Sequence, residues 1–287
     1  MPELPEVQTI VEFLKKKILG ETVQDFWSDT PYILKYPPSV AAFKKVLSGK
    51  RIVDLKRKGK YVIMDFSGDI TLVVHQKMTG HFLLGHWRQE RGRWLSTHPG
   101  RLKEKVNSYI RFLITFKSGQ MLAFSDARKF GAVYLWPSGD LHNLKNLSIG
   151  EDALIIKKKF FIDWFASKKG KIKPLLMNQK FLAGIGNIYA DEILWESGVH
   201  PLRRAQTLNL SEKESIFKAM KKILLKAITR GGSSMSDYRM PDGSEGGYMK
   251  IRKVYSLEGS PCSRDGAVIE RIKIGQRSSY FCPLHQK

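Results

Sequence analysis

The chain has 287 residues, of which 42% are hydrophobic and 11% aromatic, enough to bury real cores and to exclude wholesale disorder. Its 49 lysines and arginines exceed its 27 acidic residues, and the net charge of +22 indicates a polyanionic partner such as nucleic acid, unless the host's proteins are all rich in lysine. No apolar run could span a membrane, no signal peptide is visible, and only two cysteines are present, so we expect a cytoplasmic protein with no disulfide framework and no membrane partner.

The first half of the chain begins with a helical pattern and then changes to short β-type runs. Residues 5–18 place apolar side chains on one helical face, with Pro5 in the first turn and Gly20 after the end. Residues 86–105 are polar and basic, and we expect them to form a loop. Two hairpins are predicted around the turns 67–69 and 117–119, with strands at 61–66, 70–74, 109–116 and 120–124.

Beyond residue 136 the pattern becomes helical. The last predicted helix carries a capping box formed by Ser211 and Glu214, and a glycine-rich stretch, 231–247, follows it. The predicted helices cover 160–166, 174–180, 188–197 and 211–229. We therefore expect an α+β protein with an N-terminal β-sandwich and leading helix (1–136), a helical domain (150–247) and a C-terminal β-hairpin (250–287).

The N-terminus offers a possible nucleophile. If Met1 is removed, Pro2 has a free secondary amine with a pKa near 8, so that much of it is neutral at physiological pH. Such an amine can attack a sugar C1′ carbon and form an iminium, while the neighbouring Glu3 acts as a general acid. A retained Met1 would block this chemistry. The alternative is an ordinary start codon followed by a helix-initiating proline.

Further blocks along the chain resemble the formamidopyrimidine-DNA glycosylase family. A metal-binding finger near the C-terminus and a helix–two-turn–helix element are part of that resemblance. The matching blocks are Met1-Pro-Glu-Leu-Pro-Glu-Val7, Gly59-Lys60-Tyr61, His75-Gln-Lys-Met-Thr-Gly80, Asp126-Ala-Arg-Lys-Phe-Gly131, Ile172-Lys-Pro-Leu-Leu-Met177 with Gly184-Ile-Gly-Asn-Ile-Tyr-Ala-Asp-Glu192, and Gln276-Arg277.

The resemblance implies a bifunctional base-excision repair enzyme that removes 8-oxoguanine and formamidopyrimidines and then cleaves the abasic site by β- and δ-elimination. Pro2, Glu3, Lys60 and Arg277 would be catalytic, with no redox or nucleotide cofactor. We expect a monomer that acts on damaged double-stranded DNA at the bacterial nucleoid. The residues implied in DNA binding are Met78, Tyr109, Arg128, Phe130, Lys168, Lys173, Asn187, Ser233 and Ser234.

Within this set, Met78, Arg128 and Phe130 would fill and hold the gap left by the everted base. Taken singly, Met78 and Phe130 could equally be core residues. The segment 231–247 would close over the everted purine, although its composition also suits a linker. Two other functions stay open: an endonuclease VIII-like enzyme for oxidised pyrimidines, and a non-catalytic binder of damaged DNA.

The C-terminal finger departs from the family pattern. Where the family has four cysteines, this chain has Cys262-x2-Asp265-x16-Cys282-x2-His285, so the spacing is kept while two donors change. All four side chains can bind Zn²⁺, and we expect one structural zinc ion. The alternative is a metal-free hairpin. Tyr109 is a second departure, because it stands where the family usually has a DNA-contacting histidine.

Overall fold

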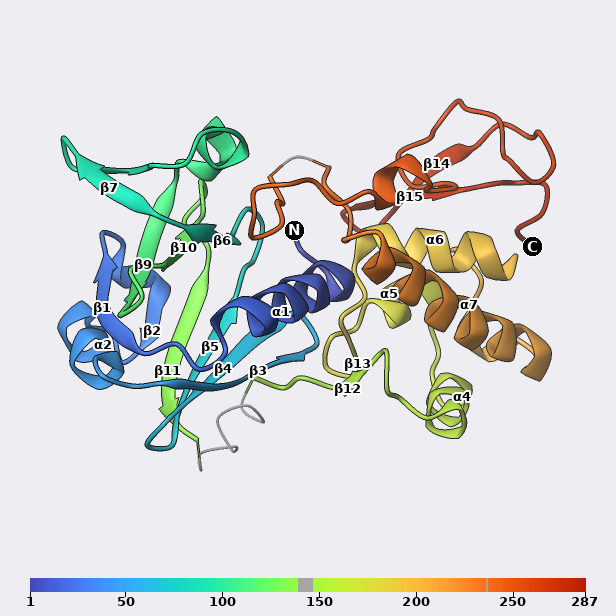
Figure 1. Ribbon diagram of the computed structural model, residues 1–287. Helices are drawn as coiled ribbons and strands as arrows, with labels where there is room; N and C mark the ends of the chain where they lie inside the picture. Colours follow the sequence, from blue (N-terminus) through green and yellow to red (C-terminus); the bar gives the residue numbers. More distant parts are fainter. Residues whose placement is uncertain (139–146, 236) are drawn as a thin grey trace. The chain divides into compact units, whose positions relative to one another are not determined.

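The computed structural model describes residues 1–138, 147–235 and 237–287. The chain is divided into two units (Figure 1). The first comprises Met1–Leu147 with Arg230–Gly247, and the second comprises Ser148–Thr229 with Tyr248–Lys287. The glycine-rich segment, which we grouped with the helical domain from its sequence position, therefore belongs to the first unit. No helix among the described residues is long and apolar enough to cross a bilayer.

Helix α1 opens the first unit and spans Leu4–Ile18, which confirms the predicted helix. Pro5 occupies the first turn, where its missing N–H costs nothing. Leu14 and Ile18 belong to the fully buried apolar face, and lysines fill the last turn, where they stabilise the negative end of the helix dipole.

Two sheets form the predicted β-sandwich, with α2 (Val40–Leu47) packed on the first strand. The four-stranded sheet has the order β1 (Val23–Ser28), β9 (Ile110–Phe116), β10 (Met121–Ser125), β6 (His81–Gly85). The five-stranded sheet has the order β2 (Leu34–Tyr36), β11 (Ala132–Pro137), β5 (Ile70–His75), β4 (Tyr61–Phe66), β3 (Ile52–Lys58).

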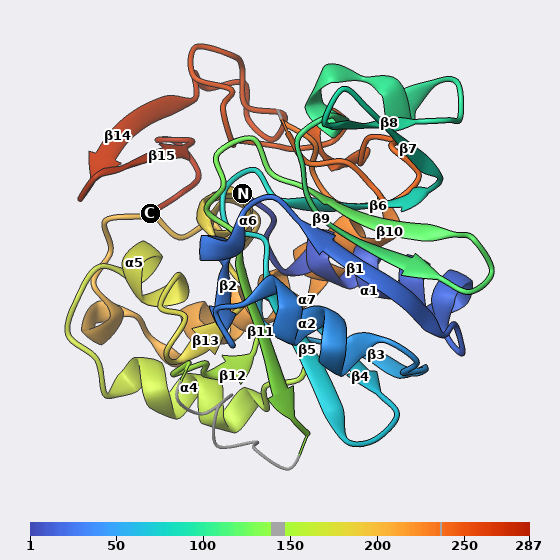
Figure 2. The same ribbon diagram turned by 90° about the vertical axis from the view of Figure 1, so that its left-hand side faces the viewer.

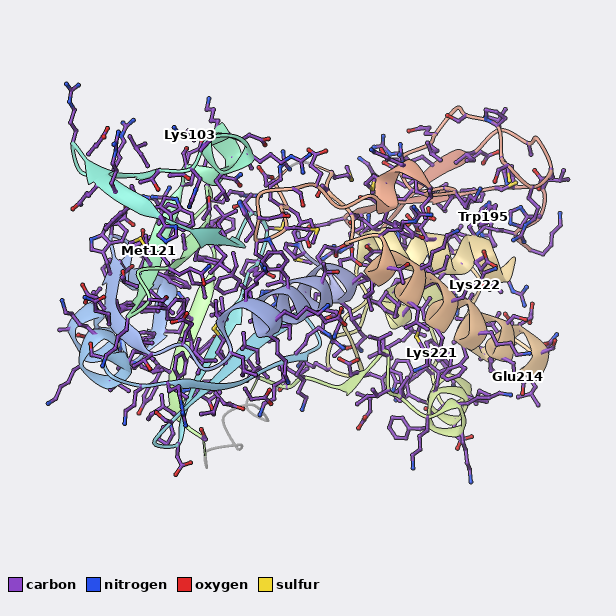
Figure 3. The ribbon with its side chains drawn as sticks, viewed as in Figure 1. Lys103, Met121, Trp195, Glu214, Lys221 and Lys222 are labelled. Carbon is purple, nitrogen blue, oxygen red and sulfur yellow. The ribbon has the colours of Figure 1, made fainter. Side chains whose placement is uncertain are left out.

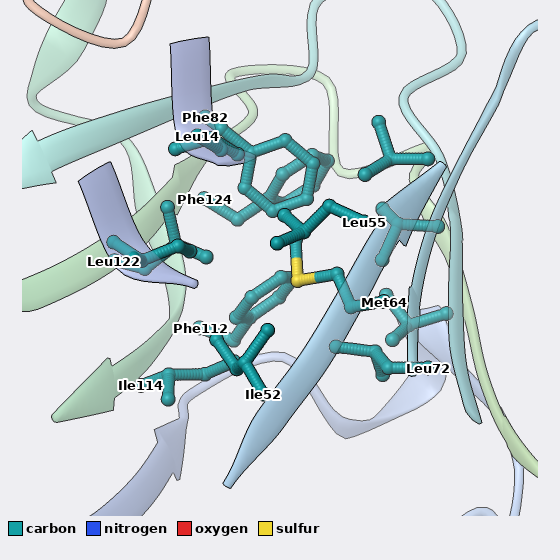
Figure 4. Close-up of a cluster of buried hydrophobic side chains, with 14 of the residues drawn as sticks. Leu14, Ile52, Leu55, Met64, Leu72, Phe82, Phe112, Ile114, Leu122 and Phe124 are labelled. Carbon is teal, nitrogen blue, oxygen red and sulfur yellow. The ribbon is translucent and has the colours of Figure 1, made fainter. Parts of the chain in front are cut away.

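The core of the first unit is built from alternate residues of these strands, because successive side chains of a strand point to opposite faces. Met64 and Leu72 come from the five-stranded sheet, and Phe112 and Phe124 of the other sheet stack with ring centroids 5.0 Å apart (Figure 4). All four side chains are fully buried. This core fixes the strand ends and the turns that carry the candidate site.

Both predicted hairpins are present, joining β4 to β5 and β9 to β10. The expectation of a loop at 86–105 is wrong. Strands β7 (Trp87–Glu90) and β8 (Arg93–Ser96) form a third hairpin there, because Arg91 and Gly92 both adopt positive φ and close a tight turn. The 3-10 helices among the described residues are η1 (Pro31–Ile33), η2 (Arg101–Lys103), η3 (Lys105–Asn107), η4 (Ala205–Thr207) and η5 (Tyr248–Lys250).

The second unit is helical and ends in the predicted β-hairpin. Strands β14 (Glu270–Ile274) and β15 (Arg277–Phe281) pair antiparallel across a tight turn. The helices are α4 (Lys158–Ala166), α5 (Ile172–Leu176), α6 (Asn187–Ser197) and α7 (Leu210–Thr229), and the short parallel strands are β12 (Glu151–Asp152) and β13 (Leu182–Ala183). These elements confirm the predicted α+β class.

Two helix predictions in this unit need correction. The helix expected at 174–180 lies at Ile172–Leu176, so that Pro174 is inside its first turn. The capping box of α7 is formed by Asn209 and Glu212, not by Ser211 and Glu214. The Asn209 side chain accepts from the Glu212 N–H at 2.9 Å, and Glu212 accepts from the Asn209 N–H at 2.8 Å.

Candidate active site and nucleic-acid interface

Pro2 and Glu3 lie at the start of α1, and both are buried, whereas Met1 is 40% exposed. The Glu3 backbone N–H donates to the Glu6 carboxylate at 2.7 Å, which fixes the backbone directly after Pro2. The candidate amine and its neighbouring carboxylic acid are therefore held at the positive end of a helix dipole.

Glu6 also binds the glycine-rich segment of the same unit. Its other oxygen accepts from the backbone N–H of Ser233 at 2.7 Å and from the Ser233 hydroxyl at 3.0 Å. Gly232 has φ +79°, and a Cβ there would lie 2.8 Å from the Glu6 side chain, so only glycine fits. The segment is thus tied to the turn that carries Pro2 and is not a free linker.

Further hydrogen bonds join described residues within this segment; Ser236 lies outside the described residues. The Ser234 hydroxyl accepts from the Gly246 N–H at 2.8 Å, and the Tyr238 hydroxyl donates to the Gly231 carbonyl at 3.3 Å. Burial raises the pKa of Tyr238 well above its ordinary value, which keeps this phenol neutral.

Lys60 follows Gly59 in the turn between β3 and β4, and only 5% of it is exposed. His75, at the end of β5, lies in the same neighbourhood. Burial, with the charges of Lys77 and Lys60, lowers the pKa of His75 to about 3. His75 is therefore neutral at physiological pH, and its Nδ1 accepts from the Lys77 N–H at 2.9 Å.

Met78, Arg128 and Phe130 are all exposed at the surface of the first unit, so neither apolar member belongs to the core. Met78 is 43% exposed and Phe130 49% exposed. The Arg128 guanidinium lies over the Phe130 ring at 4.6 Å from its centroid. Large exposed apolar side chains beside a cation are typical of a surface that binds a partner.

Asp126 joins the two loops that carry these side chains. Its buried carboxylate accepts from the Thr79 hydroxyl and, at 2.8 Å, from the Gly131 N–H. The Arg128 N–H donates to the Thr79 hydroxyl at 3.1 Å, which links the loops directly. Tyr109 borders this arrangement, because its carbonyl accepts from the Asp126 N–H at 2.8 Å.

In the second unit, Lys173 is buried, and the expectation that its ammonium contacts DNA is not supported. The ammonium lies 2.8 Å from the Asp191 carboxylate and donates to the Ser278 carbonyl and the Ser279 hydroxyl, each at 2.8 Å. Burial raises the pKa of Asp191 to about 7, an effect that Lys173 opposes. Lys173 therefore positions β15, the strand that begins at Arg277.

Arg277 itself is exposed beside a pocket of about 350 Å³ that is lined by Lys173, Pro174, Met177 and residues 274–277. Asn187 begins α6 half-buried, and its side-chain Nδ2 donates to the Tyr255 hydroxyl at 3.5 Å. The Lys168 ammonium lies 5.4 Å from the centroid of the Trp164 ring.

The predicted metal ligands converge in the second unit. One donor atom from each of Cys262, Asp265, Cys282 and His285 lies within 4.8 Å of all the others. The Cys262 Sγ to His285 Nδ1 distance is 3.7 Å, and the Cys282 Sγ to Asp265 distance is 3.3 Å. His285 Nε2 lies 3.0 Å from the Trp195 carbonyl, an arrangement that places Nδ1 among the other donors, 3.0 Å from the Asp265 carboxylate.

Family models and known relatives agree on what this chain resembles. The model of the formamidopyrimidine-DNA glycosylase N-terminal domain matches residues 1–133, and the model of the H2TH domain of the same glycosylases matches residues 149–239. Formamidopyrimidine-DNA glycosylases of Bacillus cereus and Protochlamydia amoebophila are each 33% identical, over the whole chain and over 99% and 100% of their own lengths. The chain belongs to the formamidopyrimidine-DNA glycosylase family.

Solved structures of the glycosylase family share the fold. Lactococcus lactis Fpg in complex with DNA containing an abasic site has a TM-score of 0.87 and is 32% identical, with 99% of both chains covered. A structure of MutM in complex with DNA containing carbocyclic 8-oxo-G has a TM-score of 0.86 and is 33% identical, with full coverage of both chains. As a member of the family, the chain is a glycosylase of base-excision repair.

Three anchoring carboxylates in this glycosylase escaped the sequence prediction: Glu6, Asp126 and Glu192. Glu192 accepts from the N–H groups of Val254 and Tyr255, each at 2.9 Å, and holds the start of the finger region. All three lie inside the family blocks quoted above. Nothing in the sequence revealed their partners, because most of these lie far away along the chain.

Proposed function

We propose that this protein excises oxidised purines, namely 8-oxoguanine and formamidopyrimidines, from double-stranded DNA with the amine of Pro2. One observation carries the proposal: Pro2 and Glu3 are buried together at the start of α1, and the next turn binds the glycine-rich segment through Glu6. A nucleophile, an acid and a covering segment thus meet at one helix terminus. We place this activity at the nucleoid, since the substrate is DNA and the relatives named above are bacterial.

The first chemical stage replaces one covalent bond by another. Once hydrolysis has removed Met1, the neutral Pro2 nitrogen attacks C1′, the glycosidic bond breaks, and the base leaves with a proton. Glu3 protonates the ring oxygen as the sugar opens, which yields an iminium between Pro2 and C1′. The position at the helix N-terminus favours the neutral, nucleophilic amine over the ammonium.

The second stage is strand cleavage by β- and then δ-elimination. The iminium acidifies the C2′ proton; its removal expels the 3′ phosphate, and a second elimination expels the 5′ phosphate. We assign Lys60 and Arg277 to proton transfer and to stabilisation of the departing phosphates. Hydrolysis of the remaining iminium restores the Pro2 amine.

We further propose that Met78, Arg128 and Phe130 occupy the duplex where the damaged base has left. The exposed Phe130 ring can insert between base pairs, Met78 can fill the vacated volume, and Arg128 can hydrogen-bond the unpaired opposite base. The proposed phosphate contacts come from Tyr109, Lys168 and Asn187, and the proposed cover of the everted base from Ser233 and Ser234.

For the finger we propose one structural Zn²⁺. Ligands about 2.0–2.3 Å from a tetrahedral ion lie roughly 3.3–3.8 Å apart, close to the separations found among the four donors. Bound zinc would cross-link the base of the hairpin that carries Arg277. Metal analysis should find one zinc per chain, lost in Asp265→Ala and kept in Asp265→Cys. The assignment would be contradicted if the purified protein contained no zinc and its melting temperature did not change when a chelator was added.

Borohydride trapping on duplexes that contain 8-oxoguanine tests the proposed chemistry. Protein that mass spectrometry shows to lack Met1 should form a covalent adduct with DNA, whereas protein that keeps one extra N-terminal residue should form none. A matched duplex with thymine glycol tests the endonuclease VIII-like alternative, and we expect much slower trapping there. Mature protein that binds abasic DNA without any adduct would show that it is a non-catalytic binder.

A further inference from the structure

The third hairpin, β7–β8, and the turns that follow it have no part in the proposed chemistry. Residues 86–105 contain six arginines and lysines but only two glutamates, a much higher density of positive charge than in the chain as a whole. Arg88 pairs with Glu90 at 2.5 Å, and Glu104 pairs with Arg239 at 3.4 Å. Within the described part of the chain, the other five cations are exposed and have no ion pair: Arg91, Arg93, Arg101, Lys103 and Lys105.

These cations stand on a well-anchored support. Trp87 is only 6% exposed and packs in a cluster with Leu83, Leu113 and Met121 of the four-stranded sheet. Trp94 makes an edge-to-face contact with Trp27, with ring centroids 5.4 Å apart. Because aromatic burial fixes both strands, the cations project from defined positions rather than from a solvated loop.

A pocket of about 250 Å³ lies at the base of the hairpin. Arg88 and Lys103 line it, together with the hydroxyl-bearing Ser96 and Ser108 and the two indole rings. Among the described residues the buried Trp94 Nε1 has no hydrogen-bond acceptor, which is a costly state for an N–H group. Two cations, hydroxyl groups and an unpaired N–H on an apolar floor suit a phosphodiester with its attached sugar.

The hairpin region also contacts the segment proposed to cover the lesion. Arg239 lies between Glu104 and Glu245, at 3.4 and 3.1 Å respectively. A Cβ on Gly243 would lie 3.0 Å from Arg101, so the segment packs closely on this turn. Figures 1 and 2 both show the turns that follow the hairpin beside this segment, and Figure 3 shows Lys103 on one of these turns.

We propose that residues 86–105 form a second DNA-binding surface, which holds backbone phosphates of the duplex to one side of the lesion. The inference rests on the proposed function, because the hairpin borders the segment that would cover the everted base. The backbone contacts carry no sequence information; they add affinity and set the orientation of the flanking duplex.

The proposed surface is tested by measuring how the affinity for DNA depends on salt concentration. The probe is a duplex of about 25 base pairs with a central tetrahydrofuran abasic analogue, which binds without reacting; each lost phosphate contact should lower the slope of log affinity against log salt by about 0.9. For Arg91→Ser/Arg93→Ser/Lys103→Ser we expect a slope reduced by up to about 2.7 and, at about 0.1 M salt, roughly eightfold weaker binding per contact.

The control removes the same charge from other elements of the first unit. Lys16→Ser/Lys17→Ser/Lys45→Ser changes exposed lysines of α1 and α2 and should leave the slope nearly unchanged. Equal slopes in both triple variants, or an unchanged slope in the hairpin variant, would overturn the proposal. The abasic analogue binds without reacting, so the measured salt slopes do not depend on catalysis. A failure of borohydride trapping would therefore refute the proposed chemistry without affecting the test of this surface.

Discussion

Glu6 in α1 and Glu192 in α6 are both buried carboxylates that hold a distant segment of their own unit, but they hold it with different numbers of bonds. The Glu6 carboxylate receives the N–H and the hydroxyl of Ser233 from the glycine-rich segment, and the Glu6 carbonyl receives the Tyr238 hydroxyl at 3.4 Å. Glu192 receives the consecutive N–H groups of Lys253, Val254 and Tyr255 and also the Tyr248 hydroxyl.

The difference separates a releasable attachment from a permanent one. Burial raises the pKa of Glu192, and the converging hydrogen bonds oppose that shift by stabilising the carboxylate. The finger region is thereby fixed to α6. The segment near Ser233 is attached to the Glu6 side chain through the N–H and hydroxyl of one residue, so we expect this attachment to open more readily than that at Glu192, as a segment that must admit a base and then cover it requires.

The largest expected effect concerns the permanent attachment. In Glu192→Ala, several buried donors lose a charged acceptor at about 1–3 kcal/mol each, so we expect a loss of roughly 4 kcal/mol or more in unfolding free energy. Urea denaturation measures it. The control is Glu196→Ala on the same helix, whose exposed pair with Lys222 is worth less than about 1 kcal/mol. Similar losses in both variants would contradict the distinction.

The second prediction concerns the buried ion pair beside the finger hairpin. Lys173→Met removes the cationic partner of the buried Asp191 carboxyl, whose pKa burial already raises to about 7, and we expect a loss of about 3–5 kcal/mol in unfolding free energy. The double variant Lys173→Met/Asp191→Leu should regain most of the melting temperature, because it removes both charges. If the double variant is no more stable than the single one, the loss in Lys173→Met does not come from leaving Asp191 without its ionic partner.

Much of this architecture could be predicted because its signals are local. The helix 5–18 shows its apolar periodicity within a few turns, and Ser67-Gly68-Asp69 closes a hairpin whichever partner the sheet has. The four donors near Cys262 and Cys282 could be grouped because they keep the spacing of the family's finger, and the structure brings them together. Family resemblance then named the candidate catalytic residues, which geometry alone would not have selected.

The failures have a common cause in contacts between distant residues. Lys173 follows a basic run that resembles a phosphate-binding surface, but its partner Asp191 comes from another helix and buries it. The β7–β8 strands carry so many charges that their alternation is obscured, and only packing against the four-stranded sheet reveals Trp87 and Trp94 as anchors. Sequence periodicity contains no information about such partners.

The third prediction tests the releasable attachment. Glu6→Gln keeps an acceptor for Ser233 but loses its charge, so we expect about 1–2 kcal/mol less stability for the contact. Hydrogen exchange of the Ser233 N–H should be faster by roughly tenfold, with little change in the finger region. Glu12→Gln, an exposed change on the same helix, should leave both unaffected. Faster exchange throughout both units would instead indicate global destabilisation.

The smallest expected effect comes from comparing a buried capping bond with an exposed one. In α7, Glu212 makes in an exposed position the bond that Glu6 makes in a buried position in α1. Glu212 accepts from the Asn209 N–H at 2.8 Å, three residues earlier in the chain, just as Glu6 accepts from Glu3 at 2.7 Å. Asn209→Ala removes the cap and should cost about 1 kcal/mol, measured by urea denaturation. Ser211→Ala, at the position that the sequence favoured as the cap, should change stability by less than about 0.5 kcal/mol, because surface changes away from caps have little effect. If Ser211→Ala proved the costlier change, the helix would begin later than Leu210. If Glu212→Gln, the matching change in the exposed box, cost as much as Glu6→Gln, burial would not be what strengthens the bond at Glu6.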